Sequence, residues 1–134
     1  RCMIRPAAVA VALAALATPS MATEWINCAD TGGEASFDML VGAVDVLSIV
    51  GLNISVGEQV WASDVAYGPG DPVHVGQAFE DADTIRVDAV DENVSAIIAE
   101  LRLFKATEGD AATIYAGTLR VPGHGAWAMS CSGT

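Results

Sequence analysis

Two cysteines bracket almost the whole of the chain that follows residue 22. Cys28 and Cys131 stand about a hundred positions apart, and no third cysteine lies after residue 22. In an oxidising compartment such a lone pair forms a disulfide. The chain-entropy model gives a loop of this length a stabilisation of about 4.7 kcal/mol, a large share of the roughly 5–15 kcal/mol by which a domain is stable. We therefore expect a fold whose first and last segments meet at a Cys28–Cys131 bridge.

A tryptophan precedes each of these cysteines by a few residues. Trp25 lies in TEWINC and Trp127 in GAWAMSC, and we expect both indole rings to pack as large apolar bodies near the bridge. There is no C-x-x-C, and no second ligand lies close in sequence to either cysteine. The pattern therefore predicts a structural bridge, in place of a redox pair or a thiolate metal site.

The first 22 residues have the pattern of a secretory signal peptide. Arg5 supplies a basic start, the apolar run 7–17 follows, and Ala22 ends a small-residue cleavage sequence. The apolar run is shorter than the roughly 20 residues that cross a bilayer as a stable helix. We expect residues 1–22 to be removed on export from a bacterial cell, giving a periplasmic or secreted protein with no membrane insertion after cleavage. Residues 23–134 are then expected to form a single exported β-rich domain.

The segment 23–134 is strongly acidic. Two of the six basic residues lie before it, so it carries four basic against seventeen acidic side chains and a formal charge of −13. This charge repels phosphate backbones and anionic headgroups, which argues against nucleic acid or a membrane surface as a partner. A cationic protein is the partner that the charge favours. The alternative is that the charge only keeps an exported protein soluble.

Short segments of alternating hydrophobicity, separated by turn residues, run through this part of the chain. Residues 84–89 are the clearest example, because Ile85, Val87 and Ala89 alternate with polar side chains, as a half-buried strand requires. The other strand-like segments are 37–41, 43–50, 52–56, 59–66, 73–75, 112–121 and 125–131. The pattern predicts a mostly β protein, a small antiparallel β-barrel or sandwich of about eight short strands with one disulfide.

One segment fits two interpretations. In residues 94–105, Val94, Ile97, Ile98 and Leu101 have helical spacing. The same segment also permits a strand with Ile97, Ala99, Leu101 and Leu103 on one face, and the strand is the interpretation that we favour. If 94–105 were a helix, the fold would be α+β.

Catalytic motifs are absent from the sequence. It contains no G-x-S-x-G, H-E-x-x-H, G-x-x-x-x-G-K-[ST] or G-x-G-x-x-G. His74 lies in a strand-like VHV run and is expected to be a surface strand residue, and His124 lies in a GHG turn next to the disulfide. We therefore predict a protein that is not an enzyme and needs no cofactor.

Carboxylates are plentiful enough for a calcium site to be tested. A loop that begins at Asp81 has Arg86 where the EF-hand requires glycine, so the motif fails. Asp88, Asp91 and Asn93 remain a candidate for a looser metal site. The alternative is that they form a solvated turn.

A contact surface is a further candidate. Trp61, Asp64 and Tyr67 lie in one segment beside the GPGDP loop, and aromatic side chains with a carboxylate suit contact with a cationic partner. The alternative is that Trp61 belongs to the core. On this basis we expect an exported, non-catalytic binding protein, with an envelope structural or assembly protein as an alternative.

The overall plan also resembles a known family. A signal peptide, a cysteine near the mature start, short antiparallel strands and a cysteine near the end are similar to the small periplasmic inhibitors of c-type lysozyme. The resemblance implies an anionic β-barrel that inserts loops into a cationic enzyme. That family's S-G-x-x-Y loop is not matched, since residues 62–67 contain Ser63 and Tyr67 without the intervening glycine. No residue roles are carried over.

Overall fold

The computed structural model describes residues 23–42 and 45–133, so the predicted signal peptide lies outside the described residues. Within these ranges, nine strands and one short 3-10 helix make up the fold. In the part of the chain that is described, no helix is long and apolar enough to cross a membrane. The elements are β1 (Glu24–Ala29), β2 (Ala35–Val41), β3 (Ile49–Val56), β4 (Gln59–Ala62), η1 (Val65–Tyr67), β5 (Asp71–Glu80), β6 (Thr84–Asp91), β7 (Ile97–Ala106), β8 (Ile114–Val121) and β9 (Gly125–Ser132).

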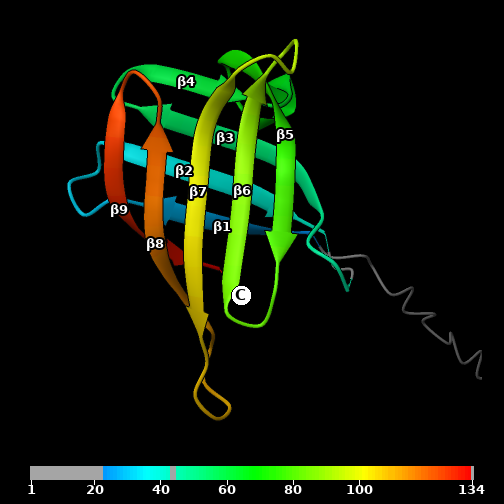
Figure 1. Ribbon diagram of the computed structural model, residues 1–134, viewed down its shortest axis with the longest axis vertical. Coiled ribbons are helices and arrows are strands. Elements are labelled where there is room, and N and C mark those ends of the chain that lie inside the picture. The colour runs from blue at the N-terminus through cyan, green and yellow to red at the C-terminus, as the bar shows by residue number, and fades with distance from the viewer. Residues whose placement is uncertain (1–22, 43–44, 134) are drawn as a thin grey trace, which may run out of the picture.

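The strands form a closed barrel in sequence order, which confirms the predicted barrel with nine strands in place of about eight. In Figure 1, β1 to β4 run across the molecule behind β5 to β9, which stand upright in front. Every neighbouring pair is antiparallel except β4 and β5, which run parallel and share only two residue pairs, Trp61 with Asp71 and Ala62 with Pro72. This short parallel contact is where the chain turns from the rear strands to the front strands.

The predicted disulfide is confirmed. Cys28 and Cys131 are directly paired across β1 and β9, with their Cα atoms 4.0 Å apart. Only three residue pairs join these two strands. The bridge therefore reinforces a short seam between the first and last strands of the barrel.

The expected positions of the two tryptophans are only half right. Trp127 shares its face of β9 with Cys131 and packs against the core, whereas Trp25 lies on the outer face of β1. The reason is the two-residue period of a strand. Trp25 is three residues from Cys28 and so must point to the opposite face, while Trp127 is four residues from Cys131 and points to the same face.

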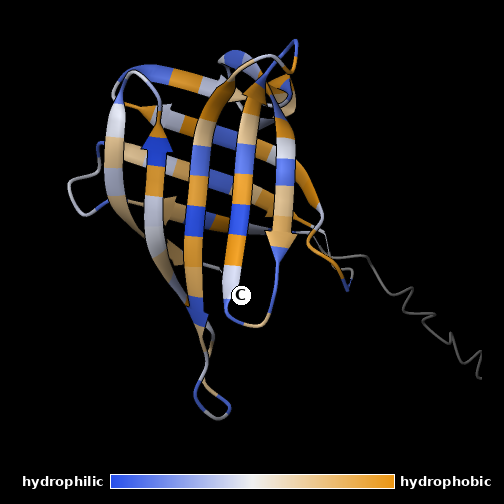
Figure 2. Ribbon diagram, viewed as in Figure 1, coloured by the Kyte–Doolittle hydropathy of each residue, from blue (hydrophilic) through white to orange (hydrophobic). Residues whose placement is uncertain are grey.

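Alternation along the strands builds the core. Figure 2 shows hydrophobic and hydrophilic residues following one another along most strands, and among the described residues no polar or charged side chain is buried. The largest fully buried side chains come from strands on both sides of the barrel: Phe37, Met39, Leu52, Ile54, Val73, Ile85, Val87, Leu101, Leu119 and Val121.

Segment 94–105 resolves in favour of a strand. Residues Ile97–Ala106 form β7 between β6 and β8, with Ala99, Leu101 and Leu103 buried, so the helical alternative is wrong. The pairing with β6 skips Ile98. Ile97 therefore leaves the buried face and is 43% exposed, because an extra residue reverses the alternation of a strand.

Several strand boundaries differ from the predictions: the predicted 73–75 lies within the longer β5, β1 was not predicted, and two further differences lie beside η1. Gly51 was expected to mark a turn between 43–50 and 52–56, but β3 (Ile49–Val56) passes straight through it, and residues 43–44 lie outside the described part. The predicted strand 59–66 ends at Ala62, since Asp64 accepts a hydrogen bond from the backbone N–H of Ala66 and caps η1. Both differences arise where η1 packs against β3, because Gly51 of β3 lies beneath the ring of Tyr67 in η1.

Candidate binding site

The predicted contact residues do not gather on one surface. Trp61 lies inside the barrel, 6% exposed, and belongs to the core. Asp64 and Tyr67 lie at the two ends of η1 on the outside. Trp61 is therefore a core residue, as the alternative interpretation expected. Tyr67 remains an aromatic residue on the surface, and its neighbours there were not among the predicted contact residues.

The neighbours of Tyr67 include a row of polar side chains across three strands. Asn27 of β1 is paired with Asp38 of β2, and Asp38 is paired with Asn53 of β3. Residues directly opposite each other on neighbouring strands share a face and lie about 4.5–5.5 Å apart. Since the residues before and after Asp38 and Asn53 are buried in the core, the row lies on the outer face of the barrel.

Trp25 and Tyr67 form an aromatic wall beside the row. Their ring centroids are 5.7 Å apart, in an edge-to-face arrangement with 75° between the planes. The Asn53 side chain donates a hydrogen bond of 2.6 Å to the carbonyl oxygen of Tyr67, and the backbone N–H of Tyr67 donates to the carbonyl of Asp64. The wall is thus held in place from both β3 and η1.

Gly51 is the residue that lets the wall lie against the sheet. A Cβ atom at this position would lie 2.8 Å from carbons of the Tyr67 ring, closer than side chains pack. Gly68 fits tightly in the same way, since its Cβ would lie 2.8 Å from the side-chain nitrogen of Asn53. A glycine inside a strand often marks such a close approach, which explains why Gly51 is not a turn.

Together these side chains line an open pocket of about 430 Å³. Its lining residues are Trp25, Asn27, Asp38, Asn53 and Tyr67. We call it the β1–β3 pocket. Its volume lies within the range of roughly 300–1,000 Å³ that is typical of ligand sites.

The carboxylate of Asp38 is the charged group of the β1–β3 pocket. Partial burial raises the pKa of Asp38 above its ordinary value, because burial disfavours the ionised form. Within residues 23–42 and 45–133, neither a hydrogen bond nor an ion pair engages this carboxylate. Burial deprives the ionised Asp38 carboxylate of part of its hydration. A partner that brings a hydrogen-bond donor or a positive charge would stabilise the ionised form in place of the lost water.

Sequence reasoning missed four of the five lining residues. The signal that was present is the polar outer position in otherwise apolar strands, such as the aspartate in FDMLV and the asparagine in LNISV. The register that brings Asn27, Asp38 and Asn53 into one row depends on how three strands pair. That information is not contained in any one strand.

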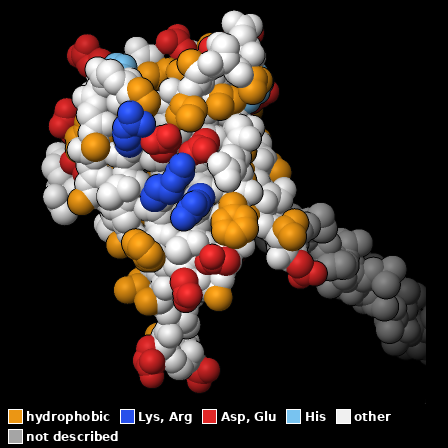
Figure 3. Space-filling view, viewed as in Figure 1, with side chains coloured by type: hydrophobic (Ala, Val, Ile, Leu, Met, Phe, Trp, Pro, Cys, Tyr) orange, Lys and Arg blue, Asp and Glu red, His pale blue; other side chains and the backbone are white. Residues whose placement is uncertain are grey.

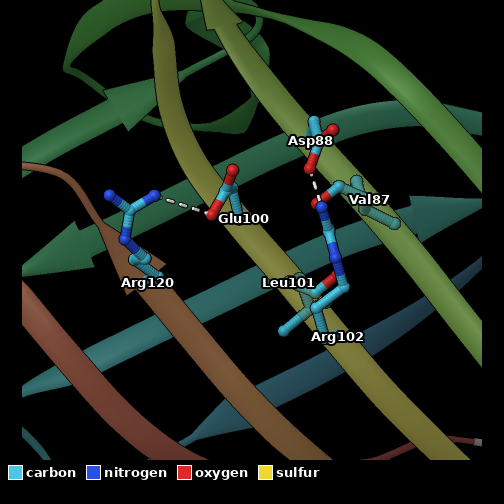
Figure 4. Close-up of polar contacts among 6 residues, drawn as sticks. All are labelled: Val87, Asp88, Glu100, Leu101, Arg102 and Arg120. Atoms are coloured by element: carbon cyan, nitrogen blue, oxygen red, sulfur yellow. Dashed lines mark hydrogen bonds and ion pairs between the residues drawn. The ribbon is translucent and has the colours of Figure 1, made fainter.

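The candidate metal ligands Asp88, Asp91 and Asn93 do not form a metal site among the described residues. Asp88 forms an ion pair of 2.8 Å with Arg102, and Leu101 and Val87 carbonyls accept from the same guanidinium (Figure 4). The carboxylate of Asp91 accepts hydrogen bonds from the backbone N–H and the hydroxyl of Ser95, and these bonds lower the pKa of Asp91. The described residues contain no group of three or more His, Cys, Asp or Glu side chains that could hold a metal ion.

The histidines are also separated from any catalytic arrangement in the described residues. His124, in the turn between β8 and β9, lies edge-to-face with Trp61 at 5.3 Å between centroids. His74 is exposed on β5. Neither side chain has a hydrogen-bond partner among the described residues that would orient it as a base.

The described Lys and Arg side chains lie on one side of the barrel. Figure 3 shows Lys and Arg side chains gathered on the face formed by the upright strands. In residues 23–42 and 45–133 all four of them belong to β6, β7 and β8: Arg86, Arg102, Lys105 and Arg120. Three of the four are ion-paired with acidic side chains. The β1–β3 pocket, on other strands, therefore has no lysine or arginine in its lining.

Comparison with models of protein families, with curated proteins and with solved structures found no match to this chain. The fold and the pocket thus define its class by themselves. It is a nine-strand β-barrel, closed by a disulfide, that carries an aromatic and carboxylate pocket on its outer face.

Proposed function

We propose that this protein is an exported, non-catalytic binding protein that recognises a cationic partner through the β1–β3 pocket. The observation that carries the proposal is the position of Asp38, a partly buried carboxylate beside an aromatic wall. Aromatic side chains together with a few convergent polar groups are the usual lining of a ligand pocket. The disulfide and the leader-like sequence 1–22 support export.

The distribution of charge supports a cationic partner. Residues 23–134 carry four basic and seventeen acidic side chains, and the described basic ones lie on β6 to β8. A molecule of this kind attracts a positively charged protein over a long range and orients it toward the strands that have no basic residues. Binding of this type weakens as salt screens the charges.

Binding to immobilised proteins of known charge tests this proposal. The panel contains c-type lysozyme, cytochrome c as a second cationic protein, and serum albumin as an anionic control. We expect the oxidised protein to bind at least one cationic member and not the albumin. Retention on no cationic protein, or equal retention on albumin, would contradict the proposal.

Inhibition of a cationic enzyme such as c-type lysozyme is a narrower alternative. It is favoured by the segment around η1, where Val65 is 92% exposed next to Asp64 and can enter a cleft of a partner. Lysis of bacterial cell walls by c-type lysozyme, measured with and without a molar excess of the protein, tests it. Full lysozyme activity in the presence of excess protein would exclude this alternative.

An envelope structural or assembly protein is the other alternative. It is favoured by exposed apolar side chains on the front strands: Phe79 at 48%, Phe104 at 71% and Ile114 at 67%. Apolar side chains gathered on a surface often mark association. Sedimentation velocity distinguishes an assembly protein from the proposed binding protein. An assembly protein forms oligomers as its concentration rises, whereas the binding protein stays monomeric.

A further inference from the structure

We propose that the β1–β3 pocket receives one arginine side chain of the cationic partner, with the guanidinium paired with Asp38 and stacked against the aromatic wall of Trp25 and Tyr67. This inference rests on the proposed function and names the group that the pocket recognises. Three features of the pocket support it: the carboxylate of Asp38, the aromatic wall, and the side-chain amides of Asn27 and Asn53.

Asp38 supplies the charge. Its carboxylate is partly withdrawn from water and, among the described residues, has no donor or cation of its own. A guanidinium presents its N–H groups in a planar fork that matches a carboxylate with two parallel hydrogen bonds. No basic side chain of the described chain lines the pocket, so none of the described residues supplies the cation.

The aromatic wall supplies the second contact. Trp25 is 37% exposed and stands edge-to-face with Tyr67, so indole surface remains available to a ligand. A guanidinium or ammonium group is attracted to the face of an aromatic ring, and tryptophan is the strongest partner. Arginine is favoured over lysine because its planar group stacks on rings and also pairs with a carboxylate.

Asn27 and Asn53 flank the carboxylate on either side. Both are neutral, so they leave the negative charge of Asp38 unopposed, and an amide oxygen can accept further N–H groups of a guanidinium. Asn53 is already fixed by its hydrogen bond to Tyr67. The pocket is therefore organised before a ligand arrives, which reduces the entropy lost on binding.

Titration with a charged ligand and its neutral isostere tests the inference. Nα-acetyl-arginine amide and Nα-acetyl-citrulline amide have the same shape, and only the first is cationic. We expect the arginine ligand to shift the NMR signals of the Trp25 indole N–H and of the Asn27 and Asn53 side-chain amides. Its affinity should exceed that of the citrulline ligand by about tenfold or more, as a cation over an aromatic ring and beside a carboxylate predicts.

Three variants assign the binding to the pocket. Asp38→Asn should remove the preference for arginine over citrulline, and Gly51→Ala should weaken arginine binding by displacing the Tyr67 ring. Glu58→Gln removes the same charge from the exposed turn between β3 and β4 and should leave binding unchanged. Circular dichroism and the near-ultraviolet spectrum establish that each variant is folded.

The outcomes separate this inference from the proposed function. Equal affinity for the two ligands, or undiminished arginine preference in Asp38→Asn, overturns the inference. A preference for N,N′-diacetylchitobiose over arginine at the same resonances overturns it in favour of a saccharide site. If cationic proteins bind while the arginine ligand shifts none of the pocket signals, the proposed function stands and the inference fails.

Discussion

The charge of Asp38 has opposite effects on binding and on stability: the ionised carboxylate is proposed to bind the partner, but its burial in this form destabilises the fold. The core residues Phe37 and Met39 are fully buried on either side of it, and partial burial raises the pKa of its carboxyl. A carboxyl whose pKa is higher in the folded than in the unfolded state ionises more readily on unfolding. Its charge therefore destabilises the fold at neutral pH, and this penalty disappears as the pH falls through the folded pKa toward the ordinary value near 4.

Asp38→Asn is accordingly expected to stabilise the protein at pH 7 while it removes arginine preference. Urea unfolding followed by tryptophan fluorescence should give a higher midpoint for the variant at pH 7, and the difference should shrink as the pH falls toward about 4. Glu58→Gln serves as the charge-matched control. A lower midpoint for Asp38→Asn at pH 7 would show that the carboxylate makes a stabilising contact.

Gly117 is the glycine whose replacement should be most harmful. A Cβ atom there would lie 1.8 Å from the carbonyl oxygen of Arg102 on β7, and backbone atoms of a paired strand cannot move aside. Gly117→Ala is expected to lower the free energy of unfolding by about 3 kcal/mol, at the upper end of overpacking penalties. The matched control is Gly42→Ala, whose nearest contact would be an ordinary 3.8 Å. Equal unfolding midpoints for the two variants would contradict the close packing of β7 and β8.

Individual elements were predictable where one strand carries its own pattern. The alternation of Ile85 and Val87 predicted β6 correctly, and the phase of Leu101 and Leu103 predicted β7. Gly51 was misassigned because a glycine in a strand looks the same in sequence as a glycine in a turn. What distinguishes it is the ring of Tyr67, which lies sixteen positions further along the chain and reaches Gly51 only in the folded state.

The turn between β6 and β7 contains a residue in an unfavourable conformation. Val94 has a φ of 56°, a left-handed value that costs a residue with a Cβ atom about 1–2 kcal/mol and a β-branched one more. Glycine adopts this φ freely, although it is more flexible in the unfolded chain. Val94→Gly is therefore expected to raise the free energy of unfolding by about 0.5–1 kcal/mol in urea titrations.

Val65→Gly serves as the control for Val94→Gly, because it makes the same change at a residue without a positive φ. Both side chains are largely exposed, at 67% and 92%, but Val65 is not among the residues with positive φ. Val65→Gly should therefore lower stability slightly, through the added flexibility of glycine. A loss of stability in Val94→Gly as well would show that the turn does not hold Val94 in a strained conformation.

At the scale of the molecule, two short seams close the barrel. The seam between β4 and β5 has two residue pairs, and the seam between β1 and β9 has three and the disulfide. The sequence predicted the second seam, because the cysteines are its markers. The first could not be foreseen, since a parallel pair between consecutive strands has no marker in the sequence. The β1–β3 pocket was missed for the same reason, as it exists only once three strands are in register.

Removal of the disulfide tests how much the seam between β1 and β9 contributes. Replacing Cys28 and Cys131 by serine is expected to lower the free energy of unfolding by about 2–5 kcal/mol, since the bridge closes a loop of 103 residues. Thermal unfolding of the variant, and of the original protein with and without reductant, measures this effect. An unchanged melting temperature on reduction would mean that the three backbone pairs close the barrel unaided.

The salt dependence of partner binding is the most direct test of the central claim, that the acidic protein recognises a cationic partner through charge. The dissociation constant for a cationic member of the panel would be measured between about 20 and 200 mM salt, a range over which the screening length falls severalfold. The account predicts that affinity falls steadily as salt rises, and that Asp38→Asn starts from a weaker value and depends less on salt. An affinity that is constant or increases across this range would contradict it, because recognition would then depend on apolar contacts alone.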